Sequence, residues 1–279
     1  MSNAAPSRPL AQPKQTSSVA NIVLPLINVA AVIGLIAANV ISQAIPLNGQ
    51  TNAQISDRYT TLFTPAGYAF SIWGLIWLGL IGFAIYQILP AQRHNPVLRG
   101  LTLPFVISCA GNISWIVFFS YNQFALSVVA IGALLLALIV IYVRLDTARG
   151  AEAPGTQTNA WRWLVKIPFS VYLGWVSVAT IADIALTLVA ADWHGGPLPE
   201  TFWTVAMLLA GGVLGAIFLI RHRDTALVFV LVWAYTAIVS KQSATPVVAG
   251  TAAVLVVFFL IGIVATWISG RRVPQTQLA

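Results

Sequence analysis

The stretch LVKIPFSVYLGWVSVATIADIALTLV, residues Leu164–Val189, decides the class of fold. It is almost entirely apolar, and at a rise of about 1.5 Å per residue it can cross a hydrocarbon core of about 30 Å. Seven other stretches share this character, so the sequence predicts an all-α, polytopic membrane helix bundle with about eight transmembrane helices. The expected spans are Asn21–Ala44, Gly67–Leu89, Leu101–Tyr121, Phe124–Val143, Leu164–Val189, Phe202–Ile220, Thr225–Ser240 and Pro246–Ile268.

The composition of the 279-residue chain agrees with this class. Hydrophobic residues make up 58% and charged residues 8%, whereas soluble domains carry about 25% charged residues. These values exclude an ordinary soluble enzyme, a disordered protein and a nucleic-acid-binding module. One cysteine, Cys109, and three well-separated histidines, His94, His194 and His222, argue against a disulfide framework or a metal site. We therefore expect the lipid bilayer as a partner, and no nucleic acid.

The basic residues predict how the helices are oriented. With eight spans and the N-terminus inside, 12 of the 14 Lys and Arg residues fall on the inner side and only Arg58 and Lys241 on the outer side. The positive-inside rule therefore predicts an N-in, C-in topology. We expect a multi-pass protein of a plasma or inner membrane, with a disordered cytoplasmic tail over residues 1–20 and a second cytoplasmic tail over residues 270–279.

One acidic residue lies inside a predicted span. Asp183 precedes Val189 by six residues, which places it about 9 Å from the outer end of its helix. A charge in the membrane is costly, so Asp183 is interpreted as a carboxyl that ties helices together, a polar anchor in a ligand pocket, or a proton-coupling site. Trp175, Ala179 and Asp183 follow at intervals of four and share one stripe of the helix.

Four of the ten tryptophans fall inside predicted helices, where an interfacial belt does not explain them. Trp73 and Trp77 share a helix face, Trp115 lies in the third span and Trp175 in the fifth. An aromatic wall with small residues and one polar anchor suits a flat hydrophobic ligand, and plain packing of large side chains is an equal alternative. Asn112 fits either a ligand contact or an interhelical hydrogen bond.

The fifth span carries a resemblance to the TspO/MBR family, the tryptophan-rich sensory proteins related to the translocator protein. Residues Tyr172–Asp183 resemble the family's run Pro-Tyr-Leu-x-Trp-Val-Ser-Phe-Ala-x-x-x-Asn. Asp183 stands at the position of the family's Asn, and Val171 replaces its Pro.

Three other segments carry the same resemblance. Asn112 and Trp115 resemble an Asn-x-x-Trp motif of the third helix, and Trp73-Gly-Leu-Ile-Trp77 resembles Trp-x-x-x-Tyr of the second. Tyr59–Pro65 matches the spacing Tyr-x-x-Leu-x-x-Pro of the first loop, although the family's double proline before the second helix is missing.

The resemblance implies a five-helix bundle over residues 21–190, followed by three additional transmembrane helices over residues 201–269. It also implies a pocket between the five helices that opens toward the first loop. The family binds porphyrins and other flat apolar ligands, so we expect a membrane receptor or sensor with a porphyrin as a candidate ligand, no other cofactor, and a homodimer as a further candidate assembly. The implied ligand-contacting residues are Tyr59, Trp73, Trp77, Asn112, Trp115, Tyr172, Trp175, Ala179 and Asp183.

Two other functions stay open. The alternative is a small-molecule transporter or permease that uses Asp183, although the two halves show no repeat of the kind that many transporters have. No constellation of catalytic residues predicts an enzyme, and the resemblance implies at most a minor tetrapyrrole-degrading activity. An ionised carboxylate at Asp183 would disfavour the propionates of a porphyrin and suit a neutral or cationic ligand.

Overall fold

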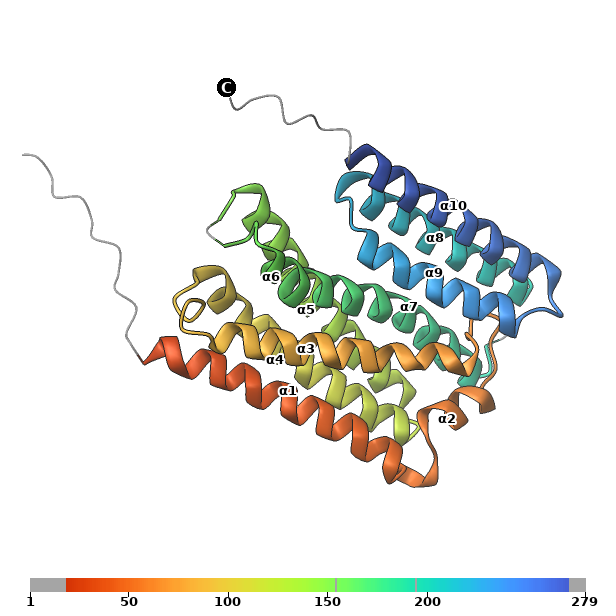
Figure 1. The fold of residues 1–279 in the computed structure, drawn as a ribbon. Helices are drawn as coiled ribbons and strands as arrows, with labels where there is room; N and C mark the ends of the chain where they lie inside the picture. Colours follow the sequence, from red (N-terminus) through yellow and green to blue (C-terminus); the bar gives the residue numbers. More distant parts are fainter. Residues whose placement is uncertain (1–18, 154, 194, 271–279) are drawn as a thin grey trace, which may run out of the picture.

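The computed structural model describes residues 19–153, 155–193 and 195–270. The two predicted tails lie almost entirely outside these residues, as does His194. Within the described residues the chain is helical and contains no strand. Figure 1 shows the long helices running side by side in alternating directions. The predicted all-α helix bundle is therefore confirmed.

Eight long helices form the described bundle. Their bounds are α1 Ala20–Ala44, α3 Ile72–Ile88, α4 Pro96–Ser120, α5 Phe124–Gly150, α7 Ile167–Ala190, α8 Glu200–Arg221, α9 Thr225–Lys241 and α10 Pro246–Gly270. Shorter elements fill the connections: 3-10 turns at Leu47–Gly49 and Gly67–Ser71, α2 at Asn52–Arg58, α6 at Asn159–Trp161, and a π-helical turn at Arg162–Lys166 that leads into α7.

Seven of the described helical stretches are long and apolar enough to cross a membrane. The exception among the eight predicted spans is α9, which has 17 residues. At about 1.5 Å per residue it measures about 25 Å, which is near the lower limit for a span. Because α9 packs against α7, α8 and α10, its neighbours shield much of its surface from lipid.

The helices associate in two groups (Figure 1). Helices α1, α3, α4, α5 and α7 pack on one another, and α8, α9 and α10 form a second group that meets the first where α9 lies against α7. Buried amides join helices of the first group. Asn28 donates to Gln87 over 2.7 Å, and Asn39 donates to Asn112 over 2.8 Å. These hydrogen bonds satisfy polar groups that lipid would leave unpaired.

Two helices extend beyond the spans predicted from hydropathy. Helix α4 begins at Pro96, five residues before the predicted Leu101, since the Asn95 side chain caps its first turn and proline is favoured there. Helix α5 continues seven residues past Val143 to Gly150. Hydropathy marks where the membrane ends, but a helix goes on through polar residues until a cap or turn stops it.

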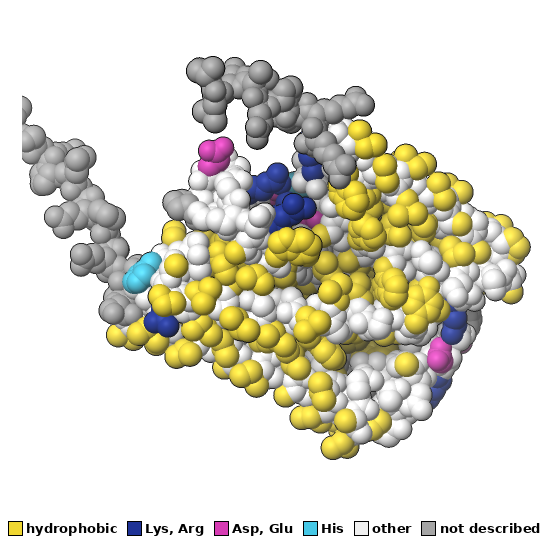
Figure 2. Space-filling view, viewed as in Figure 1, with side chains coloured by type: hydrophobic (Ala, Val, Ile, Leu, Met, Phe, Trp, Pro, Cys, Tyr) yellow, Lys and Arg dark blue, Asp and Glu magenta, His cyan; other side chains and the backbone are white. Residues whose placement is uncertain are grey.

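The described basic residues follow the predicted orientation. Arg58 and Lys241 lie at the end that carries α2, and the other eight lie at the opposite end. Figure 2 shows Lys and Arg side chains at these two ends, with the apolar band between them. We call the end with α2 the outer end and the opposite end the inner end.

Candidate functional site: an aromatic pocket at the outer end

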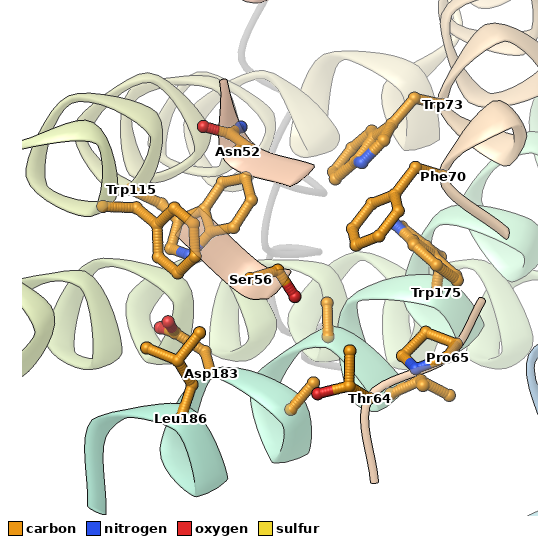
Figure 3. A pocket seen from close by; sticks show the side chains of 14 residues that line it. Asn52, Ser56, Thr64, Pro65, Phe70, Trp73, Trp115, Trp175, Asp183 and Leu186 are labelled. Carbon is orange, nitrogen blue, oxygen red and sulfur yellow. The ribbon is translucent and has the colours of Figure 1, made fainter. Parts of the chain in front are cut away.

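A pocket opens at the outer end between α3, α4 and α7, beneath α2 (Figure 3). The cavity measures about 50 Å³, room for a few water molecules, and about 580 Å³ of empty space when its open mouth is included. Its lining consists of Asn52, Ser56, Thr64, Pro65, Phe70, Trp73, Trp115, Phe119, Trp175, Val178, Ala179, Ala182, Asp183 and Leu186. The lining is mainly apolar and aromatic, which is typical of a site for a small organic ligand.

Three tryptophans from three helices form the deep wall. Trp73 of α3 stacks with Trp115 of α4, with ring centroids 6.3 Å apart and an interplanar angle of 27°. Trp73 also meets Trp175 of α7 edge to face at 6.3 Å. Trp73 is the second residue of α3 and directly follows the 3-10 turn Gly67–Ser71, which carries Phe70 into an edge contact with Trp175. The rings therefore offer both faces and edges to a ligand.

Two of these indoles bury their N–H donors at the pocket. The Trp175 Nε1 is buried without an acceptor, the Trp115 Nε1 faces the Asp183 carboxyl, and the two side chains are 2% and 7% exposed. Unpaired buried donors are rare in proteins because each costs about 1–3 kcal/mol. A ligand that brings a carbonyl, carboxylate or ring nitrogen would satisfy the Trp175 donor.

Asp183 supplies the acidic group of the pocket. The residue is only 4% exposed, and the Ser127 hydroxyl of α5 lies 3.0 and 3.1 Å from its two carboxyl oxygens. One hydroxyl hydrogen serves at most part of the accepting capacity of two oxygens. Figure 3 shows the carboxyl beside the Trp115 indole at the edge of the pocket. Asp183 thus both ties α7 to α5 and presents free lone pairs to a ligand.

The mouth is built by the first loop, residues 45–71. Asn52 and Ser56 lie four residues apart on α2 and face the cavity (Figure 3). A capping box fixes the start of this helix: the Gln54 backbone N–H donates to the Thr51 hydroxyl, and the Thr51 backbone N–H donates to the Gln54 side chain over 2.8 Å. The loop is therefore an ordered cover over the pocket.

The second helix group holds this loop in place. The Ala66 N–H donates to the Ala237 carbonyl over 3.1 Å, and the Trp233 indole donates to the Ala69 carbonyl over 3.1 Å. Three more contacts reach the loop from the same group, Leu62 N–H to the Glu200 carboxylate at 2.8 Å, Lys241 to Asp57 at 2.9 Å, and Gln242 to the Thr61 carbonyl at 3.3 Å. The C-terminal helices thus position the cover without lining the cavity.

The structure brings five of the nine predicted site residues into this pocket, namely Trp73, Trp115, Trp175, Ala179 and Asp183. The other four lie around it. Tyr172 packs edge-on against Trp73, and its hydroxyl is buried without a partner. Asn112 accepts from Asn39, and its own amide N–H group is unpaired. Trp77 follows one turn after Trp73 and also buries an unpaired indole N–H.

Tyr59 lies apart from the lining residues. Its ring packs edge-on against Phe124 at 5.1 Å, and the Arg58 guanidinium sits 5.2 Å from its centroid. Sequence reasoning missed Asn52 and Ser56 because the first loop shows no apolar period, and it missed Phe70 because a phenylalanine in an apolar span carries no signal that separates pocket from packing. The capping-box pattern at Thr51 and Gln54 was the signal for a helix there, and it would have placed Asn52 and Ser56 on one face.

Among the described residues, no group of three His, Cys, Asp or Glu side chains could hold a metal ion. The sequence model of a family described as "TSPO-like protein" matches residues 25–265. Comparison with curated proteins and with solved structures gave no match. Since the matched residues make up most of the chain, the protein belongs to the TSPO-like family, and the match runs through α8 and α9 into α10.

Proposed function

We propose that this protein is a membrane receptor that binds a flat, mainly apolar ligand in the aromatic pocket at the outer end. The observation that carries the proposal is the buried indole N–H donor of Trp175, left unpaired in a wall of three tryptophan rings. Membership of the TSPO-like family supports a membrane receptor. Tetrapyrroles combine a flat apolar ring with accepting groups, so they are the first ligand class to test.

The size of the cavity sets a condition on such a ligand. A volume of about 50 Å³ is well below the roughly 300–1,000 Å³ of pockets for drug-sized molecules. A macrocycle therefore enters only when the cover formed by Phe70 and the first loop moves outward. Smaller aromatic ligands need less displacement, so affinity should be measured for both sizes.

The test is a titration of the detergent-purified protein with protoporphyrin IX and with a smaller bicyclic aromatic carbonyl compound. Tryptophan quenching and the Soret band report binding. We expect saturable binding that Trp175→Leu weakens by at least about ten-fold, equivalent to about 1.4 kcal/mol. The matched control is Trp267→Leu, because Trp267 is 54% exposed on α10 and far from the pocket in sequence and fold.

Binding that both variants weaken equally would assign the ligand to the membrane-facing surface. No saturable binding of either probe would overturn the proposal. Loss of the Soret band over time in the same samples would reveal the tetrapyrrole-degrading activity that the family resemblance implies.

One observation favours transport as a second candidate. Helix α7 lines this pocket from Trp175 to Leu186, and near its inner start Ser170 lines a second cavity, together with Lys166 of the preceding turn. Beside the inner part of α7, the fully buried rings of Phe83, Phe105 and Phe169 pack edge to face. Uptake into proteoliposomes that is driven by a pH gradient and abolished by Asp183→Asn would favour transport, and its absence would favour binding alone.

A further inference from the structure

A second cavity lies at the inner end of the bundle, where α5, α6, α7 and the α8–α9 connection meet. It measures about 340 Å³. In Figure 2, Lys and Arg side chains gather in a hollow between the α5–α6 tip and the C-terminal helices. The residues that matter most in its lining are Arg149, Asn159, Arg162, Lys166, Ser170 and Arg223. We call this cavity the inner cleft.

The cations of the inner cleft lack carboxylate partners. Arg149, Arg162, Lys166 and Arg223 converge from three segments of the chain, and within the described residues none of them forms an ion pair. The cleft therefore presents excess positive charge in a concave, partly desolvated space, where attraction for an anion is stronger than on an open surface.

Two acids, fewer than the four cations, lie at the cleft, and both have other partners. Asp146 lines the cleft and lies 3.2 Å from the His222 ring. Asp224 is buried, where its carboxylate accepts from the Ser170 hydroxyl at 2.6 Å, the Tyr142 hydroxyl at 3.0 Å and the Leu227 N–H at 3.2 Å. These hydrogen bonds hold Asp224 at the start of α9, so it acts as a cap for that helix. Neither carboxylate is positioned to neutralise the four cations by direct pairing.

An irregular turn of backbone carries two of the cations. Arg162 and Lys166 begin and end the π-helical turn that leads into α7. Such turns are uncommon and recur at functional sites. Both side chains line the cleft, and Lys166 is half-buried. Burying part of a lysine without a paired carboxylate is unfavourable, and a bound anion would offset that cost.

Membrane topology alone does not account for this arrangement. The positive-inside rule requires basic residues near the inner ends of the helices, and it places no condition on their convergence. Arg93 and Arg144 satisfy the rule without lining the cleft, and they donate instead to the carbonyls of Ile88 and Gly100. The four cleft residues differ from these two in sharing one cavity.

We propose that the inner cleft binds a phosphate group, carried either by a lipid headgroup or by a soluble phosphate compound. The planar guanidinium group of arginine can donate two parallel hydrogen bonds to the oxygens of a phosphate. The lysine ammonium adds a compact positive charge. Asn159 and Gln157 supply further side-chain donors at the same rim. This site is independent of the aromatic pocket, which lies at the other end of α7.

The experiment is isothermal titration calorimetry of the full-length protein in a neutral detergent. The probes are inorganic phosphate, dihexanoyl phosphatidate and, as a lipid without a phosphate group, dihexanoylglycerol. We expect saturable binding of phosphate or phosphatidate, which the double variant Arg162→Gln/Lys166→Gln weakens by at least about ten-fold. Arg149→Gln changes an exposed residue on another helix and should weaken binding of the phosphate probes several-fold. This variant replaces the double variant if the double variant fails to fold. Arg144→Gln is the matched control at the same membrane end.

The pattern across the probes identifies the source of the phosphate. Binding of inorganic phosphate assigns the cleft to a soluble compound, and binding of phosphatidate alone assigns it to a lipid headgroup. Equal binding of dihexanoylglycerol, equal weakening by Arg144→Gln, or no saturable binding of either phosphate probe would overturn the proposal.

Discussion

The two helix groups differ in whether their buried polar side chains have hydrogen-bond partners. In the group of α1, α3, α4, α5 and α7, the buried indole donors on Trp77 and Trp175 have no protein partner. In the group of α8, α9 and α10, the buried Tyr235 hydroxyl donates to the Leu208 carbonyl at 3.0 Å. Within the described residues, every buried side-chain nitrogen or oxygen without a hydrogen bond lies outside this second group. The first group thus keeps unmet hydrogen-bonding capacity, and the second does not.

This difference assigns separate tasks to the two groups. Unpaired buried donors cost stability, so a fold keeps them where a ligand or solvent can meet them. In the part of the chain that the structure describes, the second group leaves no buried polar side chain without a hydrogen bond. Its residues Trp233, Glu200 and Lys241 form hydrogen bonds with the first loop. We infer that the first group is the receptor and the second is a brace for its cover.

The largest expected effect comes from a substitution that disrupts the packing of α8 against α9 and α10. A Cβ at Gly215 of α8 would come within 2.5 Å of both Leu231 of α9 and Phe259 of α10. Gly215→Val should therefore lower the thermal midpoint in detergent by at least about 5 °C, since overpacking costs about 1–3 kcal/mol or more. Gly250→Ala is the control, because no atom lies within 4 Å of its added Cβ. Equal midpoints for the two variants would contradict the close packing of this group.

The next-largest effect tests the buried N–H donors of the first group that have no acceptor. Trp175→Phe keeps an aromatic ring against Trp73 and removes one buried N–H that has no acceptor. We expect about three- to ten-fold weaker binding of a ligand with a carbonyl or carboxylate, since one hydrogen bond contributes about 1 kcal/mol. A ligand of the same shape without an acceptor should bind both proteins equally, and calorimetry measures the difference.

A smaller change concerns the acidic group of the pocket. Asp183→Asn retains side-chain hydrogen-bonding atoms near Ser127, which now lies 3.0 Å from the carboxylate. It also removes the capacity for negative charge. We expect the affinity for protoporphyrin IX, which carries two propionates, to rise by about two- to five-fold, with little change in stability. An unchanged affinity in parallel fluorescence titrations would show that Asp183 does not oppose anionic ligands.

The smallest effect is expected from removing one ion pair between the second helix group and the first loop. Lys241 and Asp57 form a solvent-exposed pair, which contributes about 0–1 kcal/mol. Lys241→Ala should leave the thermal midpoint within about 2 °C of wild type and speed ligand release by no more than about two-fold. Stopped-flow release kinetics measure the second value. Ligand release that is much slower in this variant than in wild type would argue against the proposal that the second helix group braces the first loop.

Much of the fold follows from hydropathy and charge. The eight apolar stretches and the alternation of basic residues were enough to predict the helix bundle, because continuous apolar stretches of about 20 residues fit spanning helices and not the shorter strands of a barrel. The ends of α4 and α5 were not predictable in this way. Asn95 and the polar residues after Val143 extend these helices by local hydrogen bonding, which hydropathy does not measure.

The candidate site was partly predictable. Spacing by four placed Trp175, Ala179 and Asp183 on one stripe, and all three line the pocket. The approach of Trp115 to Trp73 depends on how α4 packs against its neighbours, which no local pattern specifies. Asp224 falls between two predicted spans, where hydropathy assigns it no role, yet it is buried and joins α5, α7 and α9.

The most direct test of the receptor proposal is to locate the bound porphyrin by light. Protoporphyrin IX bound to the full-length protein would be illuminated briefly in the presence of oxygen, and oxidised tryptophans would be identified by mass spectrometry. If the ligand occupies the aromatic pocket, Trp73, Trp115 and Trp175 are oxidised first, although Trp115 and Trp175 are among the least exposed side chains. Earlier oxidation of the exposed Trp163 and Trp267 would contradict this and place the porphyrin on the lipid-facing surface.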